Sequence, residues 1–177
     1  RDFARVKVKN ARHGLENPNA RYRKAFTEEQ VLASPMVADP LRLLQICATS
    51  DGGAALVLTS MDYARRKGLD VVRVAAVSTV TPTFPNTVIE MPNFATDSAA
   101  AVPPPATAFR DAIARDAYEE AGVGPQDLDL AEVYDLSSAL ELDWYENIGL
   151  CPVGQAERLL RDGETTLRTL FFIKLLI

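Results

Sequence analysis

One stretch, residues 130–142 (LAEVYDLSSALEL), constrains the fold more than any other part of the sequence. Apolar residues precede a polar corner at 134–138, and beyond it Leu136, Leu140 and Trp144 recur at helical spacing. The pattern predicts a buried strand that passes through a short turn into a helix. In α/β proteins such a corner exposes reactive groups, because the loop leaves the carboxyl end of a strand and the helix begins with unpaired N–H groups.

The rest of the chain alternates between strand and helix patterns. In order, we expect a turn-rich loop or lid (1–22), a short helix (27–32), a strand (54–58), a helix (61–67), a strand (71–80), a long proline-rich covering loop (81–105), a helix (105–122) and then the corner. Strands that alternate with helices favour an α/β layered fold with a mainly parallel or mixed sheet.

Two helix boundaries have specific end signals. Thr27 followed by Gln30 has the form of a capping box. In this motif the Thr27 side chain accepts from the N–H of Gln30, and the Gln30 side chain accepts from the N–H of Thr27. Gly68 is predicted to follow the end of the helix, because glycine readily adopts the left-handed backbone angles found there. The basic residues 65–67 would lie in the last turn, where positive charges interact favourably with the helix dipole.

Composition and charge narrow the class of protein. The chain of 177 residues is 47% hydrophobic and 24% charged, which is ordinary for a soluble globular protein. A net charge of -5 argues against general nucleic-acid binding, although residues 1–24 are locally basic. The run at 170–177 (LFFIKLLI) is too short for a membrane span and predicts a buried strand or an exposed tail.

The two cysteines and the chain ends bear on location and completeness. Cys47 and Cys151 lie far apart without metal-ligand spacing, so we expect no disulfide framework, no metal site and a reducing, cytoplasmic location. The charged opening RDFARVKVKN lacks the apolar core of a secretory signal. The missing initial methionine is expected of a fragment, a processed chain or a numbering that omits an earlier part, and the unusual tail at 168–177 is interpreted as divergent, truncated or artefactual.

Four segments in order resemble the thiolase superfamily, and within it the sterol-carrier-protein-type, lipid-transfer branch. They are SDGGAALVLTS (50–60), ARRKGLDVVRVAAVST (64–79), AYEEAGVGPQDLDLAEVYDLSSALEL (117–142) and ENIGLCPVGQAERLLRDG (146–163). The resemblance implies part of a layered αβαβα fold. Residues 1–60 would form a covering loop subdomain and the end of the first thiolase half, and residues 61–177 an incomplete second half.

The resemblance also identifies a candidate site at the corner. Tyr134 stands where relatives that perform Claisen chemistry carry His or Asn, and neither Cys47 nor Cys151 matches the family nucleophile, so both are interpreted as small, partly buried thiols. A phenol can donate or accept a proton, which suits a retro-aldol cleavage. Asp135 either orients this phenol or caps the following helix, and capping is the more common role.

Other residues are candidates for contacts with coenzyme A. Arg12, Arg21 and Arg23 could pair with its phosphates, with a solvated basic face as the alternative. His13 lies in the stretch that resembles the covering loop, so it is predicted either to contact coenzyme A or to be exposed to solvent. No separate cofactor is expected, because coenzyme A is part of the substrate.

The tyrosine corner resembles that of the thiolase-like aldolases of bacterial steroid (cholesterol) side-chain degradation. The resemblance implies a C–C lyase that cleaves a β-hydroxy steroid acyl-CoA to a 17-keto steroid and propionyl-CoA. It implies an acyl-CoA hydratase partner with an OB-fold domain and a homodimer within a heteromeric complex. Two alternatives stay open: a sterol-carrier-type thiolase or acyltransferase, and a non-catalytic subunit that binds acyl-CoA or lipid.

Overall fold

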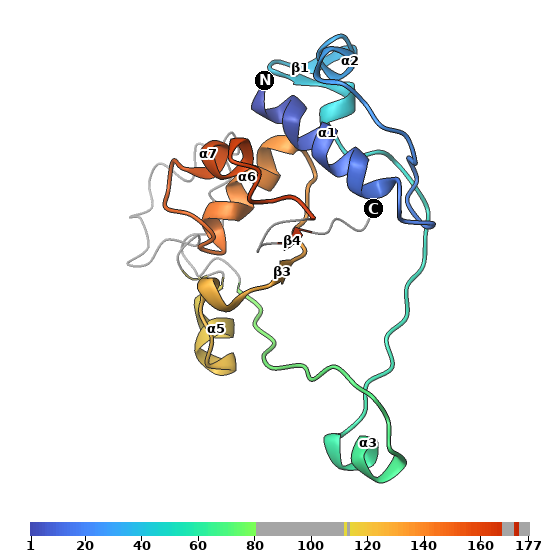
Figure 1. The fold of residues 1–177 in the computed structure, drawn as a ribbon, viewed down its shortest axis with the longest axis vertical. Helices are drawn as coiled ribbons and strands as arrows, with labels where there is room; N and C mark the ends of the chain where they lie inside the picture. The colour runs from blue at the N-terminus through green and yellow to red at the C-terminus, as the bar shows by residue number, and fades with distance from the viewer. Residues whose placement is uncertain (81–111, 113, 168–171, 174–177) are drawn as a thin grey trace, which may run out of the picture. The chain divides into compact units, whose positions relative to one another are not determined.

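The computed structural model describes residues 1–80, 112, 114–167 and 172–173 (Figure 1). The chain divides into two compact units: the first unit comprises residues 1–50 and 124–177, and the second unit comprises residues 51–123. This division does not coincide with a boundary at residue 60. The assignment of residues 1–60 and 61–177 to thiolase halves stays a prediction.

The first unit contains most of the regular structure described. Its elements are α1 (Asp2–Gly14), α2 (Glu28–Leu32), β1 (Met36–Ala38), β2 (Leu41–Arg42), η1 (Leu43–Gln45), η3 (Pro125–Asp127), β3 (Leu130–Ala131), α6 (Ser138–Asn147), α7 (Ala156–Arg161) and β4 (Phe172–Ile173). Strands β1 and β2 pair antiparallel, whereas β3 and β4 pair parallel. The corner therefore follows a strand, as predicted, but β3 is two residues long and is not the buried strand expected, since Leu130 is 52% exposed.

Helix α1 corrects the prediction of a loop or lid over residues 1–22. Ala4, Val6, Lys9 and Ala11 form its buried face, which packs against α2, α6 and α7 (Figure 1). The turn-forming residues 10–14 make the last turn of this helix instead of a loop. Turn propensity is overridden here because the tertiary contacts of an amphipathic face contribute more than local preference.

The core of the first unit lies among α1, α6 and α7. Its buried apolar side chains are Val6, Val133, Leu142, Tyr145, Ala156 and Leu160. Leu142 and Tyr145 come from one face of α6, and Ala156 and Leu160 come from α7. The corner at 134–138 is thus held between a buried residue of the preceding segment, Val133, and a helix that is anchored in the core.

The predicted helix ends are confirmed. The capping box of α2 has both bonds, with Thr27 Oγ1 accepting from the Gln30 N–H at 3.3 Å and Gln30 Oε1 accepting from the Thr27 N–H at 3.0 Å. In the second unit, α3 (Met61–Lys67) ends at Gly68, whose φ of 63° is left-handed. Strain-free access to this conformation explains the glycine.

The second unit also contains α5 (Arg115–Ala121), the described end of the helix predicted over 105–122. The covering loop predicted at 81–105 lies outside the described residues. The strands predicted at 54–58 and 71–80 are wrong for this structure, which assigns no strand there. Leu56 and Val72 are 90% and 97% exposed. A strand needs a hydrogen-bonded neighbour, and no described residue of the chain pairs with either segment.

Candidate functional site

The corner is fixed by contacts between residues far apart in sequence. Ser137 caps α6 by accepting from the Leu140 N–H at 3.3 Å, so the interpretation of Asp135 as the N-cap is wrong. The Cys47 N–H donates to the Leu136 carbonyl at 3.0 Å, and the Ser138 hydroxyl donates to the Gln45 carbonyl at 3.4 Å. Since Ser137 supplies the cap, the Asp135 side chain is left for another role.

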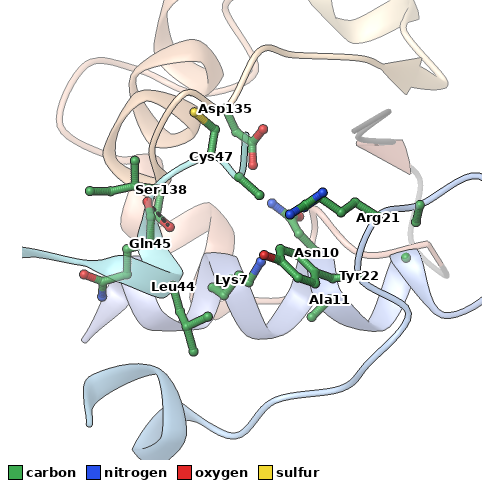
Figure 2. Close-up of a pocket in the computed structure, with 14 residues that line it drawn as sticks. Lys7, Asn10, Ala11, Arg21, Tyr22, Leu44, Gln45, Cys47, Asp135 and Ser138 are labelled. Atoms are coloured by element: carbon green, nitrogen blue, oxygen red, sulfur yellow. Dashed lines mark hydrogen bonds between the residues drawn. The ribbon is translucent and has the colours of Figure 1, made fainter. Parts of the chain in front are cut away.

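A pocket in the first unit opens beside this corner (Figure 2). Its lining comes from α1, from residues 20–22, from residues 44–48 and from the corner: Lys7, Asn10, Ala11, Gly14, Ala20, Arg21, Tyr22, Leu44, Gln45, Ile46, Cys47, Ala48, Asp135 and Ser138. Figure 2 shows Asp135 and Cys47 across the pocket from Lys7 and Asn10 of α1. Of the predicted site residues, the pocket brings together Asp135 and Arg21.

Asp135 is the acidic group of the pocket. Burial, followed in importance by the negative charge of Glu141, raises the pKa of this carboxyl to about 7. A backbone hydrogen bond and the positive charges of Lys7 and Lys9 oppose the increase. A carboxyl with a pKa near neutrality can both hold and release a proton under physiological conditions, which is the property of a general acid or base.

Lys7 is the basic residue across the pocket. Its Nζ lies 5.5 Å from the centre of the Tyr22 ring and 5.6 Å from that of Phe26, so two aromatic faces surround the ammonium group. Burial lowers the pKa of Lys7, and the negative charge of Asp135 partly opposes that change. The pocket therefore contains an acid and a base that influence each other's charge.

Beneath the pocket lies a buried polar cluster that the sequence reasoning missed. Lys9 Nζ donates to Glu141 Oε1 at 2.5 Å and to the Tyr145 hydroxyl at 2.8 Å, while Asn10 Nδ2 donates to Glu141 Oε2 at 2.5 Å. The Tyr145 hydroxyl also donates to Glu141. A sequence signal existed: Glu141 and Tyr145 are spaced i, i+4 on a helix whose neighbouring position, Leu142, is apolar.

Tyr134 directly precedes the pocket residue Asp135 in the sequence, but it does not line the pocket itself. The residue as a whole is 65% exposed. The proposed catalytic role of this residue therefore depends on a group that would approach it from outside the described part of the first unit.

The other basic candidates are dispersed. Arg12 and Arg23 are exposed and lie outside the pocket lining, and Arg23 makes a long 3.5 Å contact to the Leu15 carbonyl. His13 is half-buried in α1, so the alternative of a solvent-exposed loop histidine is wrong. The Arg21 guanidinium lies 5.3 Å from the Tyr22 ring centre at the pocket rim.

Both cysteines are free thiols, in different surroundings. Cys151 is half-buried, and burial, with smaller contributions from Glu146 and Glu157, raises its pKa to about 11, which disfavours the nucleophilic thiolate. Cys47 is exposed and lines the pocket, so the expectation of a partly buried thiol is wrong for it. Among the described residues, no group of three His, Cys, Asp or Glu side chains could hold a metal ion.

Comparisons with known proteins place the chain in a family. Residues 95–170 match the thiolase C-terminal domain-like family. Sterol carrier protein 2 of Oryctolagus cuniculus is 34% identical over 171 residues, which is 93% of this chain and 29% of that protein. The benzoylsuccinyl-CoA thiolase subunit BbsB of Thauera aromatica is 34% identical over 166 residues, covering 93% of this chain and 40% of that subunit.

A solved structure agrees with these sequence matches. A chain of the Ltp2-ChsH2(DUF35) aldolase superposes with a TM-score of 0.73 at 26% identity, covering 96% of this chain and 43% of that one. The chain belongs to the thiolase superfamily. Within the superfamily it lies on the sterol-carrier-protein-type branch, and the α/β thiolase-like fold expected from the sequence is confirmed, as a portion of that fold.

The thiolase relatives are longer than this chain, which spans less than half of each of the three. No helix in the described ranges is long and apolar enough to cross a membrane. The corner, its pocket and the neighbouring polar cluster are the features of the described structure that bear on function.

Proposed function

We propose that this chain is part of a thiolase-like aldolase, a carbon–carbon lyase that cleaves a β-hydroxy acyl-CoA by retro-aldol chemistry. The observation that carries the proposal is the tyrosine–aspartate pair at the corner, with Asp135 in the pocket at a pKa of about 7. The structural likeness to an aldolase, with a TM-score of 0.73, supports the same reaction class.

The reaction needs one group that accepts a proton and one that returns it. In the proposed step the β-hydroxyl of the substrate gives up its proton, the Cα–Cβ bond breaks, and its electron pair forms the enolate of the shortened thioester. Protonation of the enolate at Cα gives the second product. Tyr134 is proposed to exchange a proton with the substrate. Asp135 is proposed to orient the phenol and to pass protons to and from it.

The exposure of Tyr134 has a consequence for this proposal. Tyr134 is 65% exposed, so its phenol is not enclosed as a proton-transfer group needs to be, and we propose that substrate or a second subunit covers it. The name of the similar aldolase, Ltp2-ChsH2(DUF35), includes a DUF35 component. We propose a comparable partner here, an acyl-CoA hydratase with an OB-fold domain, in a complex that contains a homodimer of this chain.

The substrate side of the proposal rests on the cations near the pocket. Arg21 at the rim, with the exposed Arg12 and Arg23 and the neighbouring His13, is proposed to contact the coenzyme A part of the substrate. The acyl part is proposed to be a steroid with a three-carbon side chain, which would yield a 17-keto steroid and propionyl-CoA. Two free thiols suit a cytoplasmic location for such an enzyme.

The direct test is a turnover assay with the full protein and its partner. A β-hydroxy steroid acyl-CoA is supplied, and release of propionyl-CoA is measured by mass spectrometry. Tyr134→Phe is expected to lower the rate by at least about 100-fold, because a positioned acid or base contributes roughly 10²–10⁴-fold.

Tyr63→Phe is the matched control, since Tyr63 is 44% exposed on α3 in the second unit and its phenol makes no proposed contact with substrate. It should retain the wild-type rate. Wild-type turnover that is unaffected by Tyr134→Phe would exclude the phenol from the reaction. Binding of the acyl-CoA without any turnover would instead favour a non-catalytic lipid-binding subunit.

A second candidate is acyl transfer of the conventional thiolase kind. It is favoured by the relative named benzoylsuccinyl-CoA thiolase subunit and by the position of Cys47 on the pocket wall. Free coenzyme A separates the two reactions, because thiolysis consumes it and retro-aldol cleavage does not. A Cys47→Ala variant that stops coenzyme A consumption would support the thiolase alternative.

A further inference from the structure

The buried polar cluster beneath the pocket is too costly to be only packing. The Lys9 and Glu141 side chains are 5% and 0% exposed and their charged atoms lie 2.5 Å apart. Removing two charges from water costs several kcal/mol per ion, and replacing such a pair with apolar residues is often neutral or stabilising. A pair of this kind therefore calls for a role beyond holding α1 against α6.

Both carboxylate oxygens of Glu141 accept hydrogen bonds from neighbouring side chains. Oε1 accepts from Lys9 and from the Tyr145 hydroxyl, and Oε2 accepts from Asn10 at 2.5 Å. Three side chains on α1 and α6 thus fix one carboxylate in position.

Two residues connect this carboxylate with the pocket. Asn10 donates to Glu141 and also lines the pocket, and Ser138, at the start of the helix that carries Glu141, lines it as well. Asp135 lies on the same pocket wall, three residues before Ser138. Glu141 is therefore one hydrogen bond away from the lining of the pocket that contains Asp135.

The charged groups that act on Asp135 come from both packed helices. From α1, Lys7 and Lys9 favour its ionised form; from α6, Glu141 disfavours it. Arg21, Tyr22 and Cys47 complete the titratable groups of the pocket wall. The contribution of Glu141 exceeds that of either lysine, so the cluster as a whole favours the protonated carboxyl.

We propose that Glu141 is a positioning residue: anchored by Lys9, Asn10 and Tyr145 next to the pocket lining, it holds a fixed negative charge that, together with burial, favours the protonated form of Asp135. The catalytic importance of Glu141 rests on the proposed lyase function, because Asp135 takes part in proton transfer only in that reaction. Its effect on Asp135 itself does not depend on any reaction.

The first test measures Asp135 directly. The side-chain carboxyl of Asp135 is titrated by ¹³C NMR in the full chain, with the signal assigned by its loss in Asp135→Asn. Glu141→Gln removes the charge at nearly constant volume and is expected to lower the titration midpoint by about one pH unit, the lower end of the effect of a neighbouring charge. Asp143→Asn, two residues along the same helix and thus on another face, is the control and should leave the midpoint in place.

A second variant covers the case in which Glu141→Gln does not fold. Lys9→Met combined with Glu141→Gln removes both buried charges, so no unpaired ion is left in the core. The midpoint of Asp135 should again fall, by less than in the single variant, because Lys9 opposes Glu141. An unchanged or higher midpoint in the variants, or a wild-type midpoint near the ordinary aspartate value of about 4, would overturn the proposal.

The second test uses the reaction. If the lyase activity is present, the pH at which the rate changes should move down with the NMR midpoint in Glu141→Gln and remain in place in Asp143→Asn. A purely structural role would lower the rate at every pH without moving the profile. If no lyase activity is found, the NMR titration still decides the inference, so its failure and that of the proposed function are distinguishable.

Discussion

The two units place similar chemical groups in opposite surroundings. In the first unit, Lys9 and Glu141 form an ion pair with side chains 5% and 0% exposed. In the second unit, Arg65 and Asp62 form one at 3.1 Å with side chains 71% and 79% exposed. The same contrast holds for apolar residues, since Leu142 of α6 is 5% exposed and Leu56 is 90% exposed. Burial, more than the kind of contact, determines what each interaction contributes.

The largest expected difference is between the two ion pairs. Lys9→Met should lower the free energy of unfolding of the first unit by about 3–5 kcal/mol, because it leaves Glu141 buried without its cation. Arg65→Met should change the stability of the second unit by at most about 1 kcal/mol. Urea unfolding followed by fluorescence of Trp144, the single tryptophan, reports the first unit, and hydrogen exchange of the α3 amides reports the second. Equal losses in both units would contradict the contrast.

Apolar truncation should give the next largest difference. Leu142→Ala is expected to destabilise the first unit by about 2–5 kcal/mol, since it removes buried methyl groups and leaves a cavity beside Tyr145 and Leu160. Leu56→Ala is expected to change stability by no more than about 0.5 kcal/mol. The same two measurements apply, and a large effect of Leu56→Ala would show that residues 54–58 are packed in solution.

The pH dependence of the first unit offers a third test. Because the folded-state pKa of Asp135 is raised from 3.8 to about 7, the stability associated with its protonated form is complete below about pH 4 and is lost as the pH rises to 7. Asp135→Asn stays neutral, so above pH 7 it should be more stable than the wild type, by about 2 kcal/mol once partial exposure is discounted. Below pH 4 the two should agree.

Trp144 fluorescence over a pH series measures that difference. Asp62→Asn is the matched control, because it removes a carboxyl from the second unit and should leave the Trp144 transition as in the wild type at each pH. A constant stability difference between Asp135→Asn and the wild type from pH 4 to 8 would contradict the prediction.

Removing a helix N-cap should cost about the same stability in both units, so the caps serve as a reference. Thr27→Ala in the first unit and Ser60→Ala in the second each remove a side-chain oxygen that accepts from a backbone N–H at the third helical position. Both should cost about 1 kcal/mol. Amide exchange in α2 and α3 measures these losses, and a cap without effect in only one unit would show that its helix is already frayed.

What the sequence predicted correctly was mainly local. The capping box at Thr27, the glycine end of α3 at Gly68 and the turn into α6 depend on a few neighbouring residues, so they could be inferred from the sequence. The strand-to-helix corner was likewise predictable from the change in apolar spacing around residue 134.

The errors and omissions concern contacts between distant residues. Helix α1 was mistaken for a loop because its buried face includes Lys9, whose burial makes sense only once Glu141 is opposite it. The strand patterns at 54–58 and 71–80 describe side chains suited to a sheet, but pairing depends on a neighbouring strand that local sequence does not specify. The sequence neighbours of Asp135 indicate a candidate site, but most of its pocket is formed by residues about ninety positions earlier or more.

That separation also sets an order in time. Lys9 and Glu141 are 132 positions apart, and at synthesis rates of about 5–20 residues per second the lysine waits on the order of ten seconds for its partner to be made. Until then α1 cannot bury its charged position. The pocket beside the corner is therefore assembled only after Glu141 has left the ribosome, when the first part of the chain closes onto the last.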